Sequence, residues 1–192
     1  MNQTTFLPLF KSIDELLLTN KRIIISLEGG SASGKSTLAL ELKDKYECTL
    51  FHMDDFYLRP SQRTIERLNE IGGNIDVERF YEEIVEPILK NENIYYRKFD
   101  CSTQVLSEPI SVEPKQLIII EGAYSMHPLL QNIYDLKVFL DISKDLQIQR
   151  INQRNSPNMA KRFFEEWIPL ENKYFSTLKI KEKCDLVIKI KD

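Results

Sequence analysis

The sequence predicts an α/β fold of three layers, in which a mainly parallel sheet carries helices on both faces. Short, continuously apolar segments such as residues 22–27 and 117–120 are typical of strands buried on both faces of a parallel sheet. These segments alternate with stretches of helical periodicity, which is the pattern of βαβ units. The chain has 192 residues, the size of one domain of about 100–200 residues. We therefore expect a single domain over residues 1–192.

The individual elements follow from hydrophobic spacing along the chain. A helix over residues 5–18 is expected on the outside of the domain, within an N-terminal extension of residues 1–20. Pro87 and Pro169 should each kink the helix that contains it. Residues 94–110 indicate extended structure with turns, as in a hairpin beside the main sheet. Further strands are expected at residues 48–53, 136–140 and 186–190, and further helices at residues 34–46, 77–89, 143–154 and 159–179.

Composition excludes several classes of protein. The chain has 26 Lys and Arg against 29 Asp and Glu, a net charge of −3 that gives no general nucleic-acid footprint. No apolar run reaches the roughly 18 residues that a membrane span needs, and residues 1–10 carry no basic segment of a secretory signal. The three cysteines, Cys48, Cys101 and Cys184, suit a reduced cytoplasmic protein better than a disulfide scaffold or a zinc site. A homo-oligomer is compatible with these features.

One motif indicates a chemistry. Residues 29–36 fit the pattern G-x-x-x-x-G-K-[ST] between a predicted strand and a predicted helix, which is the context that a phosphate-binding loop requires. Its backbone N–H groups can surround phosphate oxygens, Lys35 can reach the β- and γ-phosphates, and the Ser36 hydroxyl can join the shell of Mg²⁺. The alternative is a glycine-rich turn with a surface lysine, which the flanking elements disfavour. The sequence therefore predicts a site for ATP and Mg²⁺ formed by Gly29, Gly30, Ser31, Ala32, Ser33, Gly34, Lys35, Ser36 and Thr37.

The rest of the chain narrows the class of enzyme. A GTPase usually carries N-K-x-D for guanine, and the segment at residues 172–175 lacks the Asp. Motor and transport ATPases are normally larger or carry further motifs. A short chain with one phosphate-binding loop favours a small-molecule kinase.

Acidic residues follow two predicted strands at the edge where open α/β sheets bind ligands. Asp54 and Asp55 come after the strand that ends near residue 53, and Glu121 directly follows another strand. Such carboxylates can hold Mg²⁺ or accept a proton from an acceptor hydroxyl. A turn or a helix cap is the alternative for each of them. Beside a phosphate-binding loop we favour the functional role, and we assign Ser36, Asp54 and Glu121 as candidate metal ligands.

Three motifs together resemble the uridine kinase family, which is related to nicotinamide riboside kinase, pantothenate kinase and phosphoribulokinase. They are GGSASGKST at residues 29–37, HMDDFY at residues 52–57 and IIIEG at residues 118–122. The resemblance implies a three-layer P-loop NTPase fold with a helical lid, and ATP:Mg-dependent transfer to a hydroxyl of a nucleoside, uridine or cytidine first. It makes Asp54 the residue that orients or deprotonates the acceptor hydroxyl, and it assigns Glu121 to the metal or acceptor side.

The resemblance also suggests acceptor contacts, with departures from the family pattern. Tyr57 belongs to the D-x-F-Y motif, Asp76 falls on the family's N-F-D segment, and Tyr96 lies where relatives contact the nucleoside. Asp76 is equally suited to capping the helix that begins at residue 77. Glu28 stands where relatives have a small residue, and we expect its carboxylate to face away from the phosphates or to contact a cation.

A lid is expected over residues 143–180, including the helix that follows it. Arg150 and Arg154 resemble the R-x-x-x-R arrangement of nucleoside kinase lids, and Arg162 is a candidate substrate contact near Lys161. Such arginines can neutralise charge on the transferred phosphoryl group, whereas a solvated helix face is the alternative. We read the apolar stripe that follows as core packing, namely Phe163, Phe164, Trp167, Ile168, Phe175 and Leu178.

The sequence is also compatible with two other functions. A kinase of the same fold could act on another small metabolite, such as nicotinamide riboside or pantothenate. A non-kinase regulatory protein could bind ATP without transferring phosphate, although it would have no need for Asp54, Glu121 and the lid arginines together.

Overall fold

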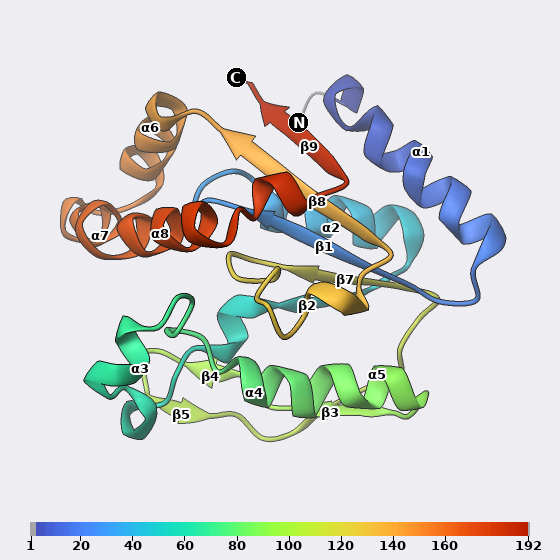
Figure 1. The fold of residues 1–192 in the computed structure, drawn as a ribbon, viewed down its shortest axis with the longest axis horizontal. Coiled ribbons are helices and arrows are strands. Elements are labelled where there is room, and N and C mark those ends of the chain that lie inside the picture. Colours follow the sequence, from blue (N-terminus) through green and yellow to red (C-terminus); the bar gives the residue numbers. More distant parts are fainter. Residues whose placement is uncertain (1–2, 192) are drawn as a thin grey trace.

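The computed structural model describes residues 3–191 and contains a parallel sheet of five strands (Figure 1). Its strand order is β2-β7-β1-β8-β9, and every neighbouring pair in it is parallel. The α/β fold with a parallel sheet is thus confirmed. The strands are β1 (Ile23–Gly29), β2 (Thr49–His52), β7 (Leu117–Glu121), β8 (Leu136–Ile142) and β9 (Leu186–Ile190).

The sheet separates two hydrophobic cores, because successive side chains of a strand point to opposite faces. Ile23, Ile25 and Leu27 of β1 pack with α1 (Gln3–Thr19) and α2 (Lys35–Tyr46). Ile24 belongs to the other core, which takes in α4 (Val77–Phe80) and Tyr174 of α8 (Ile168–Leu178). Burial on both faces explains why these strands are continuously apolar.

The two helical segments that contain Pro87 and Pro169 each widen before the proline, whereas α1, which contains Pro8, is a regular α-helix. A π-helical turn, Tyr81–Val85, joins α4 to α5 (Glu86–Lys90) just ahead of Pro87. Another, Phe163–Trp167, joins α7 (Pro157–Arg162) to α8 just ahead of Pro169. Proline lacks the N–H of a regular turn and its ring crowds the preceding carbonyl groups, and a wider turn accommodates both effects.

Smaller elements surround the sheet (Figure 1). The region expected as a hairpin forms two antiparallel pairs, β3 (Ile94–Tyr96) with β6 (Ile110–Val112) and β4 (Phe99–Asp100) with β5 (Val105–Leu106). The remaining α-helices are α3 (Ile65–Asn69) and α6 (Lys144–Arg154). Short 3-10 helices occur at Met53–Phe56, Pro60–Gln62, Gln131–Ile133 and Lys181–Lys183. Between residues 3 and 191, no helix is long and apolar enough to cross a membrane.

Strand register places the predicted site residues at one edge of the sheet. Glu121 at the end of β7 is in register with Leu27 of β1 on one side and with His52 of β2 on the other. Parallel neighbouring strands end together, so the loop after β1 and the Asp54 segment after β2 both start beside Glu121.

Candidate active site

The phosphate-binding loop joins β1 to α2 and depends on glycine at two positions. Gly29 has φ +144°, and a Cβ there would lie 2.6 Å from the carbonyl oxygen of Leu140. Gly34 adopts the left-handed conformation, with φ 97°, as the residue that caps α2. Both conformations are costly for residues with a Cβ. The loop therefore takes this shape because of its own residues and its contact with β8.

The donors of the loop suit an anionic ligand. Within the described chain, no side chain caps the N-terminus of α2, so its first N–H groups lack an intrahelical or side-chain acceptor. The Lys35 side chain lies within the loop, where its Nζ donates to the carbonyl oxygens of Gly29 at 2.8 Å and Gly30 at 3.1 Å. An ammonium group beside free N–H donors and a helix dipole fits the phosphates of a nucleotide.

A cavity of about 360 Å³ opens beside the loop. It is lined by eight of the residues proposed from the sequence: Ser31, Ala32, Lys35, Ser36, Asp54, Tyr57, Glu121 and Arg154. These residues come from widely separated segments of the chain, and the strand ends and the helices after β8 bring them to one space. Its volume is within the range of small-molecule sites, about 300–1,000 Å³.

Asp54 and Tyr57 both line this cavity and contact each other. Asp54 lies on the 3-10 helix after β2, and its Oδ1 accepts a hydrogen bond of 3.1 Å from the Tyr57 hydroxyl. Water reaches the Asp54 side chain, yet the cavity walls enclose it, and this desolvation raises the pKa of the carboxyl. Lys35 and the Tyr57 hydrogen bond oppose the shift, whereas Glu121 adds to it. A carboxylate of raised pKa is a stronger base than an ordinary aspartate.

Glu121 is almost completely buried and is paired with a histidine. Its Oε1 lies within hydrogen-bond distance of Nδ1 of His52, the last residue of β2. This hydrogen bond raises the pKa of His52, although partial burial of the ring opposes the effect. The pair orients the Glu121 carboxylate at the floor of the cavity.

The oxygen atoms of the cavity suit Mg²⁺ better than a softer metal. Ser36, Asp54 and Glu121 all line it. Residues 3–191 hold no group of three His, Cys, Asp or Glu side chains that could bind a metal by themselves. Mg²⁺ typically takes one or two protein carboxylates and completes its shell with phosphates and water, so a sparse oxygen set fits it.

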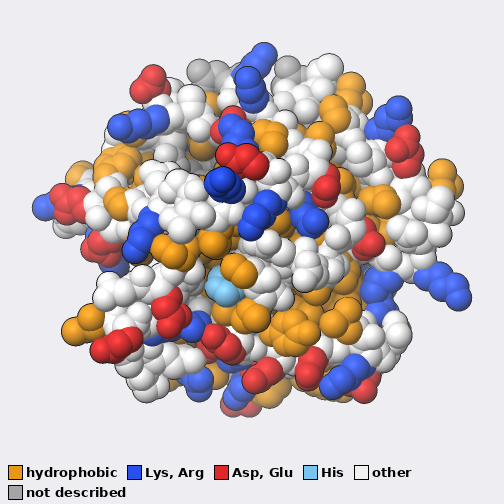
Figure 2. Space-filling model, viewed as in Figure 1, with side chains coloured by type: hydrophobic (Ala, Val, Ile, Leu, Met, Phe, Trp, Pro, Cys, Tyr) orange, Lys and Arg blue, Asp and Glu red, His pale blue; other side chains and the backbone are white. Residues whose placement is uncertain are grey.

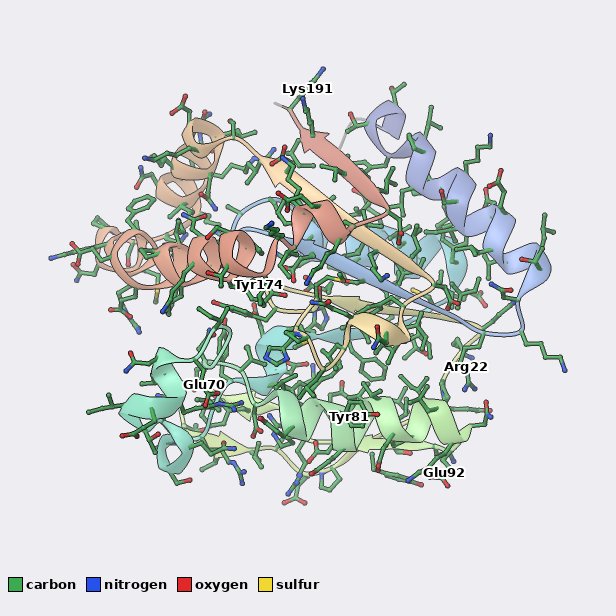
Figure 3. The ribbon with its side chains drawn as sticks, in the orientation of Figure 1. Arg22, Glu70, Tyr81, Glu92, Tyr174 and Lys191 are labelled. Atoms are coloured by element: carbon green, nitrogen blue, oxygen red, sulfur yellow. The ribbon has the colours of Figure 1, made fainter. Side chains whose placement is uncertain are left out.

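Glu28 points away from the cavity, one of the two outcomes expected for it. The buried carboxylate accepts hydrogen bonds from the N–H groups of Gly29 at 2.9 Å and Met126 at 3.0 Å, and from the Tyr174 hydroxyl at 3.1 Å. Figure 3 shows Tyr174 on the inner side of α8, toward the sheet. Burial raises the pKa of Glu28 to about 7. Its partners are neutral donors, so it is a structural carboxyl behind the loop.

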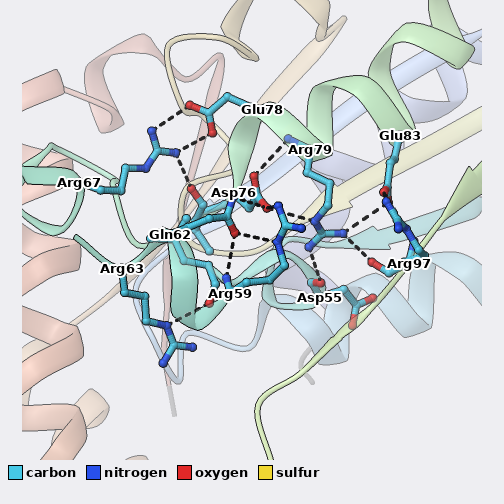
Figure 4. A network of polar contacts seen from close by, with 12 residues as sticks. Asp55, Arg59, Gln62, Arg63, Arg67, Asp76, Glu78, Arg79, Glu83 and Arg97 are labelled. Carbon is cyan, nitrogen blue, oxygen red and sulfur yellow. Dashed lines mark hydrogen bonds and ion pairs between the residues drawn. The ribbon is translucent and has the colours of Figure 1, made fainter. Parts of the chain in front are cut away.

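Asp76 does not line the cavity and instead takes part in a network of polar contacts (Figure 4). It is the N-cap of α4, accepting from the N–H of Arg79 at 3.3 Å, and its Oδ2 accepts from Nε of Arg79 at 3.2 Å and Nε2 of Gln62 at 3.0 Å. Of the two roles considered for it, the structure supports the cap. Tyr96 also does not line the cavity: its ring packs in the core against Phe51 and Phe56.

The lid arginines differ in their surroundings. Arg154 lines the cavity, and Nη1 of Arg150 donates to the Ala32 carbonyl at 3.2 Å. Arg162 is half exposed and does not line the cavity. Its guanidinium pairs with Glu166 at 3.2 Å and lies over the ring of Trp167, 4.8 Å from the ring centroid. Lys161 is exposed and lies 3.8 Å from Glu165.

The reading of the lid stripe as core packing is wrong for Phe163 and Trp167. Both line the cavity together with Met159, and the next residue of the series, Glu171, lines it too. The signal was present in the sequence, because these four residues are spaced by four and so share one helix face. Other lining residues were not foreseen as site residues, among them Asn74 and Tyr124.

The face shown in Figure 2 carries charged side chains of both signs. Among its described side chains, Lys and Arg are interspersed with Asp and Glu and do not gather into one basic stretch.

Comparison with known proteins agrees with this geometry. Residues 24–162 match the phosphoribulokinase / uridine kinase family. A uridine kinase from Bacillus cereus (strain B4264) is 31% identical over 147 residues, covering 71% of this chain and 68% of the relative. One from Clostridium perfringens (strain ATCC 13124) is 25% identical over 183 residues and 86% of each chain. The structure of a possible uridine kinase from Bacillus stearothermophilus superposes with a TM-score of 0.67 at 22% identity, over 95% of this chain and 100% of that one.

The family match spans the loop, both acidic strand ends and the start of the lid. The chain therefore belongs to the phosphoribulokinase / uridine kinase family and is a small-molecule kinase.

Proposed function

We propose that the protein transfers the γ-phosphoryl group of ATP to a hydroxyl of a nucleoside, with uridine and cytidine as the first candidates. The observation that carries this proposal is that one and the same cavity is lined by residues of three predicted parts of the site. They are Lys35 and Ser36 of the phosphate-binding loop, Asp54 and Glu121 of the strand ends, and Arg154 of the expected lid. The phosphate donor and the hydroxyl acceptor must bind next to each other for transfer to occur. A cavity lined by residues of the loop, the strand ends and the helices after β8 could hold both. Dependence on Mg²⁺ and a cytoplasmic location are parts of the same proposal.

In this proposal each residue has a role that follows from its surroundings. The N–H groups at the start of α2 and the Lys35 ammonium bind the phosphates and hold them in line with the acceptor. Asp54, hydrogen-bonded to Tyr57, orients the acceptor hydroxyl and takes its proton. Arg154 neutralises charge on the transferred group. Mg²⁺, when held by oxygens of Ser36, Asp54 and Glu121, would neutralise phosphate charge.

The acceptor pocket has a polar side and an apolar side. Tyr57, Asn74 and Tyr124 offer hydroxyl and amide groups, whereas Phe163 and Trp167 offer aromatic rings. The guanidinium of Arg154 lies over one face of Phe163 and that of Arg162 over one face of Trp167, so the opposite faces are the ones left for a ligand. Aromatic faces can stack on a planar ring, and the polar groups can hydrogen-bond ribose hydroxyls. This combination supports an acceptor with a ring and several hydroxyls.

One observation favours a second candidate, a kinase for another hydroxyl acceptor. The acceptor contacts implied by the resemblance include Asp76 and Tyr96, yet Asp76 is committed to Arg79 and Gln62 and Tyr96 to aromatic packing. A pocket without these two groups could suit a different metabolite, such as nicotinamide riboside or pantothenate.

The experiment is acceptor-stimulated release of ADP from MgATP. Uridine, cytidine, nicotinamide riboside, pantothenate and sugar alcohols are supplied in turn, and we expect uridine or cytidine to give the greatest stimulation. Stimulation by nicotinamide riboside or pantothenate alone would support the second candidate. No stimulation by any acceptor, with nucleotide binding intact, would contradict the acceptor assignment.

A further inference from the structure

A buried carboxylate touches the phosphate-binding loop, and the proposed reaction gives it no role. Glu171 of α8 is only 6% exposed and lines the cavity. A negative charge beside a site for a polyanion is electrostatically unfavourable. Burial raises the pKa of this carboxyl, and Lys35 together with hydrogen bonds from Ser31 opposes the shift. The contacts that Glu171 makes in the folded protein must therefore offset the cost of burying its carboxyl beside an anion site.

Glu171 holds one residue of the loop by two hydrogen bonds. Its Oε2 accepts from the backbone N–H of Ser31 at 2.8 Å, and its Oε1 accepts from the Ser31 hydroxyl. The carbonyl oxygen of Ser31 is also occupied, because Nε2 of Gln147 on α6 donates to it at 2.9 Å. Both backbone polar groups of Ser31 are thus bonded to helices of the segment expected as a lid, α6 and α8.

This arrangement links the loop to the lid wall. Arg150 on α6 adds a third contact at the neighbouring Ala32 carbonyl, 3.2 Å away. Trp167 lies four residues before Glu171 in one continuous helical segment and lines the same cavity. A shift of the outer turn of the loop would therefore be transmitted through Glu171 to the aromatic wall.

We propose that Glu171 is a positioning residue that fixes the outer turn of the phosphate-binding loop to the lid helices through its bidentate contact with Ser31. This proposal rests on the proposed function, since it assigns the cavity to a nucleotide. Because the Ser31 N–H is taken by Glu171, phosphate binding is left to the other N–H groups of the loop and to those at the start of α2. The role depends on the reach and the acceptor geometry of the side chain, and its charge is incidental.

Two conservative variants separate reach from charge. Glu171→Gln keeps the length and removes the charge: the amide oxygen can accept from the Ser31 N–H, and the amide N–H₂ can donate to the Ser31 hydroxyl. Glu171→Asp keeps the charge but is one methylene shorter and cannot make both contacts from the same backbone. Glu165→Gln and Glu165→Asp are matched controls, since Glu165 is an exposed carboxylate of the same helical segment.

Trp167 is the only tryptophan of the sequence, so its fluorescence reports on the lid wall without any need for an acceptor. MgADP is titrated into each variant while fluorescence is recorded, its affinity is measured by calorimetry, and kcat is measured with the stimulating acceptor. We expect Glu171→Gln to retain the wild-type fluorescence change and kcat. Glu171→Asp should bind MgADP with a clearly smaller fluorescence change and a kcat lower by about tenfold, since small displacements of a binding group are costly in phosphoryl transfer.

The outcomes are distinguishable. Wild-type behaviour of Glu171→Asp overturns the proposal, and so does a Glu171→Gln variant as impaired as Glu171→Asp, because charge would then be the operative property. A wild-type protein that does not bind MgADP overturns the proposed function itself, whatever the variants do.

Discussion

The phosphate-binding loop and the acceptor side of the cavity are built in different ways. The loop is one continuous segment, residues 29–36, whose shape follows from its glycines and from the helix that begins at its end. The acceptor side gathers Asp54, Tyr124 and Trp167 from three distant segments. A short continuous segment can thus contain all the residues that bind an anion. Recognition of the proposed acceptor depends instead on which distant segments the sheet and the helices after β8 bring together.

The largest expected effect tests the loop. Lys35→Ala removes the ammonium group whose Nζ lies among the loop carbonyls, and we expect acceptor-dependent ADP release to fall by about 1000-fold or more, since it loses charge compensation in the transition state. Lys43→Ala, an exposed lysine of the same helix, is the control and should retain activity. Substantial transfer by Lys35→Ala would mean that the loop does not hold the transferred phosphate.

The next effect tests the acceptor side. Asp54→Asn keeps the size of the side chain but removes the base, so we expect transfer to fall by about 100-fold or more, while the phosphate-binding loop still binds ADP. Asp55→Asn is the neighbouring control, because Asp55 pairs with Lys98 at 2.9 Å and does not line the cavity. Transfer by Asp54→Asn at a rate near that of the wild type would remove Asp54 from the mechanism.

Glu28 directly precedes the loop in sequence, yet the pKa of its carboxyl is set by burial in the folded protein. Its pKa rises to about 7 on folding, so the folded protein binds this proton more tightly than the unfolded chain does. The free energy of unfolding should therefore decrease as pH rises from about 4.5 to about 7, by roughly 3 kcal/mol from this group. Urea unfolding at several pH values should show a shallower decrease for Glu28→Gln. Identical pH dependence in the two proteins would count against the buried, titrating carboxyl.

The smallest effects separate two lid arginines that look equivalent in the sequence. Arg154 lines the cavity, whereas Arg162 is paired with Glu166 on the surface. We expect Arg154→Ala to lower kcat by about tenfold to 100-fold, and Arg162→Ala to leave kcat nearly unchanged, since an exposed ion pair contributes little. Steady-state kinetics of both variants gives the answer. Equal losses would show that the lid closes further than this structure does and carries Arg162 into the site.

Much of the fold follows from the sequence. The five parallel strands and the large helices lie within a few residues of their predicted ranges, because continuous apolar runs and helical spacing report burial directly. The acceptor side was harder to predict. Phe163 and Trp167 look like core residues, and an apolar side chain facing a cavity has the same spacing as one facing the core. The contact of Glu171 with Ser31 has no local signal, since the two residues lie 140 positions apart.

The sequence by itself determined the fold class, the phosphate-binding loop and the acidic strand ends, because each depends on neighbouring residues or on a periodic pattern. Only the tertiary structure decided that Asp76 caps a helix, that Arg154 and not Arg162 lines the cavity, and that Glu171 holds Ser31. These outcomes depend on which side chains of distant segments meet. Strand register and helix packing determine these contacts, and no short stretch of sequence predicts them.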